Sequence, residues 1–174
     1  MEDYTMEKHT IIALMEDKPG VLNRVSNMFR RRNYNIESLA VGHSETPNIS
    51  RMTIVVHGDN RVVEQVVKQL NKLVNVTEVV NVDNMPTVIR ELALIKVAAG
   101  PGTRSEIIEL AQVFRGRIVD VGSTSMTVEI TGPEDRVNSL IKLLRPYGIE
   151  ELTRTGRVAM VRSGDATNGN NGNH

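Results

Sequence analysis

The order of hydrophobic patterns repeats once along the chain, and this repeat constrains the fold more than any other feature. A nearly all-apolar segment at 9–15 predicts a strand, and apolar residues at helical spacing follow a Pro-Gly turn. The first copy predicts these elements in order: strand 9–15, a helix with its apolar stripe at 21–29, strands 35–43 and 51–57, a helix capped by Asp59 with its stripe at 62–73, and strand 76–82.

The same order returns after residues 83–87, which break the pattern. The second copy predicts strand 92–98, a helix with its stripe at 107–114, strands 117–121 and 126–130, a helix with its stripe at 137–144, and a last strand or pair of strands within 150–161. Thr103 with Glu106, and Thr131 with Glu134, predict capping boxes at these two helices. The first capping box explains the Gly-Pro-Gly segment before Thr103, which lacks the Lys and the spacing of a phosphate loop.

Two β-α-β-β-α-β units predict an α+β protein of two ferredoxin-like domains, each an antiparallel four-stranded sheet with both helices on one face. We expect domains at 8–84 and 90–162, a linker at 85–89, and a disordered Asn/Gly-rich tail at 163–174. The apolar run at 11–15 lacks the alternation of a strand with one face in water. We therefore expect a second subunit to protect the other face, or an edge, of the first sheet.

Charge and composition disfavour several classes of function. The 174 residues carry 21 Lys and Arg against 21 Asp and Glu, which does not favour a basic face for nucleic acid or anionic lipid. Without Cys, disulfides and thiolate metal sites are excluded. No signal peptide, membrane span, metal-ligand spacing or nucleophile-base set is recognisable. We expect a soluble, cytoplasmic protein in which catalysis by this chain alone is poorly supported.

The strand-to-helix turn at 16–22 is the first candidate site. Free N–H groups at a helix N-terminus attract a carboxylate, and Gly20 lets a ligand approach the backbone. Asp17 is suited to accept the ammonium of a zwitterion, so an amino acid matches the charges of this turn. An ordinary turn in which Asp17 caps the helix uses the same residues, and both interpretations stay open.

Asn35 is the second candidate. It begins a strand shortly after Asn33, which suits the left-handed conformation that often follows a helix. Asn35 either hydrogen-bonds the loop or contacts a ligand at an interface, and its sequence position does not distinguish the two.

Three motifs stand out in the first unit: Glu16-Asp17-Lys18-Pro19-Gly20-Val21-Leu22, Tyr34-Asn35-Ile36-Glu37-Ser38-Leu39 and Ser50-Arg51-Met52-Thr53-Ile54. Together they resemble the regulatory (small) subunit of acetohydroxyacid synthase, also called acetolactate synthase. The resemblance covers about residues 8–164 and continues in motifs such as Arg154-Thr155-Gly156. The Asn-Ile-Glu-Ser-Leu stretch is specific to this family, whereas the Pro-Gly-Val-Leu turn indicates only the wider group of ACT domains. Family members often have Gly where this chain has Asn33, and Asn or Asp at position 17.

The resemblance implies an N-terminal ACT domain that dimerises sheet-to-sheet and a C-terminal ACT-like domain. It implies feedback inhibition by a branched-chain amino acid, usually valine, bound at the dimer interface. It also implies activation of a separate catalytic large subunit that holds thiamine diphosphate, Mg²⁺ and FAD, with no cofactor in this chain.

The effector-site residues that the resemblance implies are Asp17, Gly20, Val21 and Leu22 from the turn, and Asn35 and Ile36 from the facing subunit. The Val21 and Leu22 amides would hold the carboxylate, and Ile36 would line the apolar pocket.

Two other classes of function are weighed against this one. One is a free-standing ACT-type amino-acid sensor without an enzyme partner, which co-purification with a thiamine-dependent large subunit would exclude. The other is an RNA-binding module of the same topology. Its third strand would need ring side chains, and residues 52–56 provide none.

Overall fold

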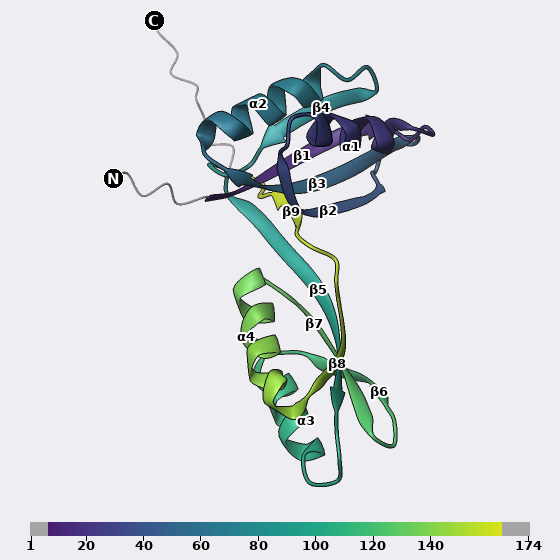
Figure 1. Cartoon of the computed structure of the whole chain (residues 1–174), viewed down its shortest axis with the longest axis vertical. Coiled ribbons are helices and arrows are strands. Elements are labelled where there is room, and N and C mark those ends of the chain that lie inside the picture. Colours follow the sequence, from purple (N-terminus) through teal and green to yellow (C-terminus); the bar gives the residue numbers. More distant parts are fainter. Residues whose placement is uncertain (1–6, 165–174) are drawn as a thin grey trace, which may run out of the picture.

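The computed structural model describes residues 7–164, which form two β-α-β-β-α-β domains joined end to end (Figure 1). The first domain comprises β1 (Glu7–Glu16), α1 (Val21–Arg31), β2 (Asn35–His43), β3 (Ile49–Gly58), α2 (Asn60–Asn71) and β4 (Val76–Asn81). The second comprises β5 (Thr87–Ala98), α3 (Arg104–Val113), β6 (Arg117–Val121), β7 (Ser125–Gly132), α4 (Glu134–Leu144), the 3₁₀ helix η1 (Arg145–Tyr147) and β8 (Ile149–Arg154), followed by β9 (Val158–Val161). The predicted fold class is confirmed. Most of the predicted tail, from residue 165 on, lies outside the described residues.

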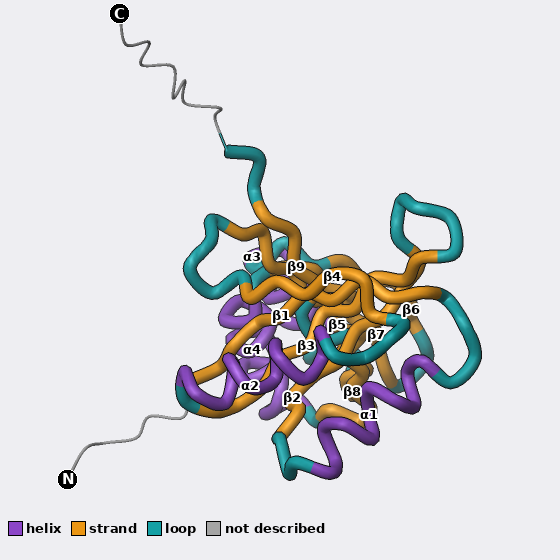
Figure 2. The backbone as a smooth tube through the Cα atoms, turned by 90° about the horizontal axis from the view of Figure 1, so that it is seen from above, coloured by secondary structure: helices purple, strands orange, loops and turns teal. Residues whose placement is uncertain are grey.

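The first sheet is antiparallel with strand order β2-β3-β1-β4, and α1 and α2 cover one of its faces (Figure 2). Every second residue of β1 faces these helices, because side chains alternate along a strand. Ile11, Ala13 and Met15 are buried with Phe29 of α1 and Leu70 of α2. In this order β2 is an edge strand, and within residues 7–164 no other strand pairs with its outer side.

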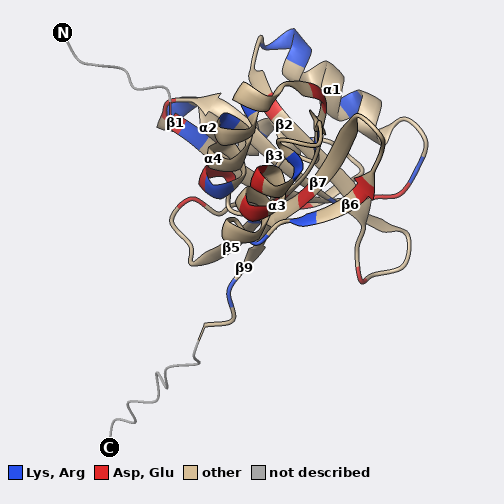
Figure 3. Cartoon of the chain, turned by 90° about the horizontal axis from the view of Figure 1, so that it is seen from below, with Lys and Arg blue, Asp and Glu red and all other residues tan. Residues whose placement is uncertain are grey.

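The second sheet has the order β6-β7-β5-β8, and its core lies between β5 and the helices α3 and α4. The opposite face is polar: Lys96 Nζ lies 3.1 Å from Glu151, and Arg117 lies 2.6 Å from Glu129. Lys and Arg residues are scattered among Asp and Glu residues over both domains (Figure 3). The second sheet therefore presents a face suited to water, unlike the first.

Strand β5 begins earlier than predicted and connects the two domains. Residues 87–89, expected in a linker, already form strand and pair with β9. Ala159 of β9 packs with Ile12 and Val82 on the face of the first sheet away from the helices. The chain's own β9 therefore covers part of the face for which the apolar run predicted a second subunit.

Two local predictions about helix ends are confirmed. Asp59 accepts a hydrogen bond from the Val62 N–H at 2.9 Å, so it caps α2 as expected. Asn33 has a φ of +56°, the left-handed conformation that follows α1.

Both predicted capping boxes are wrong. The Thr103 side chain makes no capping bond to α3, and the Glu106 carboxylate instead accepts a hydrogen bond from the Tyr147 hydroxyl at 2.7 Å. Helix α4 begins at Glu134, so this residue lies at the first helical position and cannot form the third position of a box with Thr131. Its carboxylate bonds to cations outside the helix.

Candidate functional site

The turn between β1 and α1 leaves backbone donors free at a helix N-terminus. Gly20 has a φ of +84°, which favours glycine, and an added Cβ there would meet no atom within 4 Å. The Val21 N–H donates to the Lys18 carbonyl at 3.3 Å. Within the part of the chain that the structure describes, the N–H groups of Leu22 and Asn23 have no backbone acceptor. These two donors, beside open space, can bind an anion.

Asp17 faces the β2–β3 hairpin from the start of this turn. Its N–H donates to the Asn48 carbonyl at 2.8 Å, and its carboxylate lies 3.3 Å from Nδ1 of His43. The Asp17 side chain is 47% exposed and makes no capping bond to α1. The interpretation of Asp17 as a helix cap is therefore wrong, and its carboxylate can pair with a cationic group.

Neighbouring polar residues tie the turn to the start of β4. Glu16 lies 2.9 Å from Lys18 Nζ and accepts a hydrogen bond from the Asn75 amide at 2.6 Å, and Arg24 donates to the Asn75 side-chain oxygen. The hydrogen bonds from Lys18 and Asn75 lower the pKa of Glu16 below its ordinary value. The turn is thus held by side chains that do not occupy the free amides.

Asn35 and Ile36 lie at the far end of β2 from this turn. Because β2 runs from Asn35 to His43 and rises about 3.3 Å per residue, its ends are separated by about 26 Å. Asn35 is exposed, whereas Ile36 is partly buried against the first core. Within one chain the structure therefore does not bring Asn35 and Ile36 to Gly20.

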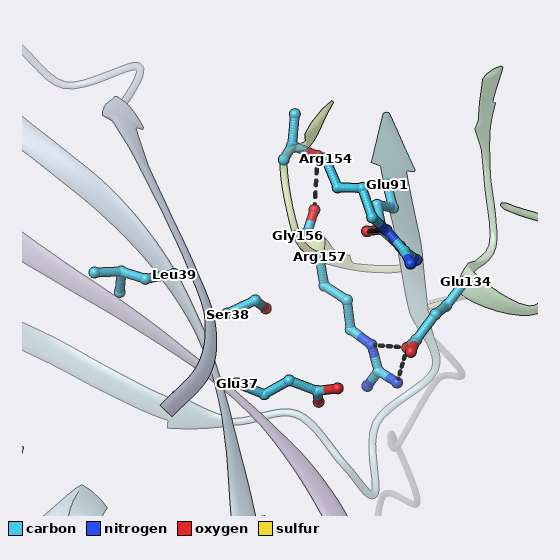
Figure 4. Close-up of a pocket in the computed structure, with 9 residues that line it drawn as sticks. Glu37, Ser38, Leu39, Glu91, Glu134, Arg154, Gly156 and Arg157 are labelled. Atoms are coloured by element: carbon cyan, nitrogen blue, oxygen red, sulfur yellow. Dashed lines mark hydrogen bonds and ion pairs between the residues drawn. The ribbon is translucent and has the colours of Figure 1, made fainter. Parts of the chain in front are cut away.

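A cavity of about 390 Å³ lies between the two domains (Figure 4). On one wall Arg154 holds Glu91 with two hydrogen bonds of 2.6 and 2.8 Å. Arg157 Nε donates to Glu134 at 2.9 Å. The Glu37 carboxylate points from β2 toward this second pair in Figure 4.

Lys8 of β1 joins the carboxylates of this cavity. Its Nζ lies 2.7 Å from Glu37 and 2.7 Å from Glu134. The hydrogen bonds with Glu134 and Glu37 raise the pKa of Lys8. Burial acts to raise the pKa of Glu134, but hydrogen bonds from Lys8 and Arg157 outweigh it and lower the pKa to about 2.

Within residues 7–164, no group of three or more His, Asp or Glu side chains is arranged to hold a metal ion. None of the helices in the same residues is long and apolar enough to cross a membrane.

Comparison with known proteins assigns both domains. A family model described as the AHAS small subunit-like ACT domain matches residues 11–78, and one described as the small subunit of acetolactate synthase matches residues 90–163. The probable acetolactate synthase small subunit of Archaeoglobus fulgidus is 58% identical over 155 residues, covering 89% of this chain and 97% of that protein. The chain belongs to the acetolactate synthase small-subunit family.

Further members support this assignment. The probable small subunit of Methanothermobacter thermautotrophicus is 52% identical over 157 residues, covering 90% of this chain and 94% of that protein. The crystal structure of the Thermotoga maritima acetolactate synthase small subunit has a TM-score of 0.85 and 42% identity, covering 92% of this chain and all of that one. The first domain is thus the ACT domain of a small subunit, as the motifs indicated.

Sequence reasoning missed several polar groups of this small-subunit chain. The Asn23 amide belongs to the anion-binding turn, and Lys8, Glu134 and Arg157 meet at the domain joint. Arg157 directly follows the motif Arg154-Thr155-Gly156, Asn23 directly follows the motif at 16–22, and Glu134 lies in a predicted capping box, but none of these patterns indicated the roles found here, and no pattern marks Lys8.

Neutralising Glu134 is expected to remove a stabilisation that depends on pH. Because the folded-state pKa of about 2 lies below the ordinary value of 4.5, the stabilisation is present above the ordinary value and is lost as the pH falls toward 2. Glu134→Gln should lower the free energy of unfolding by at most roughly 3 kcal/mol at pH 7 and by roughly 1 kcal/mol at pH 3. Urea denaturation at both pH values measures the difference. Asp135→Asn is the control, and a cost for Glu134→Gln that does not change with pH would contradict the assignment.

Proposed function

We propose that this chain is the regulatory subunit of acetolactate synthase, which raises the activity of a separate catalytic large subunit and makes it sensitive to valine. The observation that carries the proposal is the family match, which runs through both domains. In this proposal the large subunit holds thiamine diphosphate, Mg²⁺ and FAD, and this chain supplies no group to the reaction.

The proposed effector site is the turn before α1. The free N–H groups of Leu22 and Asn23 donate to the carboxylate of the amino acid, which the helix dipole also favours. The carboxylate of Asp17 pairs with the ammonium group. The open space at Gly20 admits the ligand next to the backbone.

A second copy of this chain completes the site in this proposal. Two β2 edge strands can pair antiparallel about a twofold axis at their midpoint. Such pairing places Asn35 of one copy opposite His43 of the other, because these residues begin and end β2. Since His43 contacts Asp17 in its own chain, Asn35 and Ile36 of the second copy then approach the turn.

We expect the purified chain to form no acetolactate from pyruvate. Added to the catalytic large subunit, it should raise the rate and make that rate fall with increasing valine. The measurement is acetolactate formation by the chain, by the large subunit, and by the mixture, each titrated with valine, leucine and isoleucine.

Each outcome distinguishes a class of function. Turnover by the chain alone would overturn the proposal. Valine binding measured by calorimetry, without any stimulation of the large subunit, would instead identify a free-standing amino-acid sensor.

A further inference from the structure

Four charged residues at the domain joint, Lys8, Glu37, Glu134 and Arg157, form one cluster, which we call the joint cluster. Lys8 comes from β1, Glu37 from β2, Glu134 from the first position of α4, and Arg157 from the connection between β8 and β9. Arg157 bonds to Glu134 and also reaches the Thr10 hydroxyl of β1 at 3.3 Å. The Glu134 side chain is only 20% exposed, so solvent and salt screen its ion pairs less than those of a surface pair.

The joint cluster is the direct polar contact between the ACT domain and α4. Among side-chain hydrogen bonds within residues 7–164, only that from Lys8 to Glu134 joins the first domain to this helix. The chain itself crosses the joint twice, along β5 and along the β8–β9 connection (Figure 1). The position of α4 against the first domain therefore depends on Lys8 and Arg157.

Glu37 links this cluster to the strand that carries Asn35 and Ile36. The register of β2 against β3 shifts between Ile36 and Ser38, so Glu37 lies in a β-bulge. A bulge bends and twists a strand locally, and this one directs the Glu37 carboxylate to Lys8 at 2.7 Å. A displacement at the start of β2 thus acts on Glu37 without crossing the rest of the sheet.

The neighbouring residue touches the second domain's connection as well. Ser38 lies so close to Gly156 that a Cβ added to Gly156 would be 2.7 Å from the Ser38 Cβ. Ser38 therefore lies directly against the connection to β9, whereas Glu37, which is also 3.3 Å from His57 of β3, reaches the second domain within residues 7–164 only through Lys8, whose ammonium it shares with Glu134.

We propose that the joint cluster couples the effector site to the second domain. A ligand that repositions the start of β2 moves Glu37, and Lys8, which Glu37 and Glu134 share, passes the displacement to α4. The inference rests on the proposed effector site, because it describes how ligand binding at that site affects the second domain. Coupling requires that the ion pairs of the cluster differ between the ligand-free and ligand-bound chains.

The test is hydrogen exchange of the full chain with and without saturating valine, in wild type, Glu134→Gln and Asp135→Asn. In the wild type, valine should slow exchange of the α4 amides by at least about fivefold, the lower end of typical allosteric coupling. Glu134→Gln should lose this response while it still binds valine in calorimetry. Asp135 follows Glu134 in the same helical turn, and its side chain makes no hydrogen bond or ion pair within the described residues, so Asp135→Asn should respond as the wild type does.

The same variants are then combined with the large subunit. The valine concentration for half-inhibition should rise at least about fivefold for Glu134→Gln, with Asp135→Asn unchanged. A wild-type response in Glu134→Gln overturns the proposal, as does loss of valine binding, which would make the cluster part of the binding site. If circular dichroism shows that Glu134→Gln does not fold, Lys8→Gln takes its place with the same expectations. A wild-type chain that fails to bind valine in calorimetry contradicts the proposed function itself, before any exchange is measured.

Discussion

Replacing Gly20 with aspartate is expected to abolish inhibition by valine. The new carboxylate would lie at the N-terminus of α1, where it competes for the Leu22 and Asn23 amides and repels the carboxylate of the effector. It would also fill the space next to Gly20. Each charge-assisted hydrogen bond contributes about 1.5–3 kcal/mol, so losing two weakens binding by roughly 10²- to 10⁴-fold.

The measurement is the activity of the reconstituted enzyme against valine concentration. Gly20→Asn is the matched control, because Asn tolerates the left-handed backbone and has nearly the same shape without the charge. We expect Gly20→Asn to lose less sensitivity than Gly20→Asp, and activation to be retained in both. An unchanged inhibition curve for Gly20→Asp would move the effector site away from this turn, and loss of activation as well would make the turn structural.

Replacing Gly156 with alanine is expected to destabilise the joint between the domains by about 2–5 kcal/mol. A non-glycine residue at the observed φ of +75° costs about 1–2 kcal/mol, and overpacking against Ser38 adds about 1–3 kcal/mol. Gly148→Ala is the matched control, because Gly148 has a φ of +97° but an added Cβ there would lie 3.6 Å from its nearest neighbour, an ordinary contact.

Urea denaturation followed by circular dichroism compares the two variants. Gly156→Ala should unfold at a clearly lower urea concentration than Gly148→Ala. In a Ser38→Gly background, Gly156→Ala should cost less free energy of unfolding than it does in the wild type, because the side chain that the new methyl group overpacks has been removed. Equal midpoints for Gly156→Ala and Gly148→Ala would mean that the close approach of Ser38 costs nothing.

Elements whose signals are local could be predicted from the sequence. The stripe of α1 is an example: Val21, Val25, Met28 and Phe29 recur at helical spacing, and all four are buried. The bounds of β2 were predicted at both ends, because Asn33 ends the preceding helix and a Pro-containing loop follows His43. Such features depend on residues within one turn or hairpin.

Features that depend on distant residues could not be predicted. Lys8 and Glu134 are 126 residues apart in sequence, and neither lies in a pattern that identifies its partner. The capping box at Glu134 failed because α4 begins at Glu134 itself, and the carboxylate bonds instead to Lys8 and Arg157 from outside the helix. The candidate turn was found from its charges, and the Val21 and Leu22 amides were expected to hold the carboxylate. The structure changes one of these two, because the Val21 N–H donates to the Lys18 carbonyl and leaves the Asn23 N–H free beside that of Leu22.

The pairing of β9 with the start of β5 has a consequence for how the protein is made. Ala159 packs beside Ile12, which precedes it by more than a whole domain in sequence, so the first domain emerges from the ribosome before the strand that covers part of its sheet has been synthesised. Nascent chains halted before residue 158 would expose Ile12 and Val82 to water. Such intermediates are prone to aggregate, and chaperones bind exposed apolar surface of this kind. Translation that slows before residue 158 would prolong this exposure and lower the soluble yield.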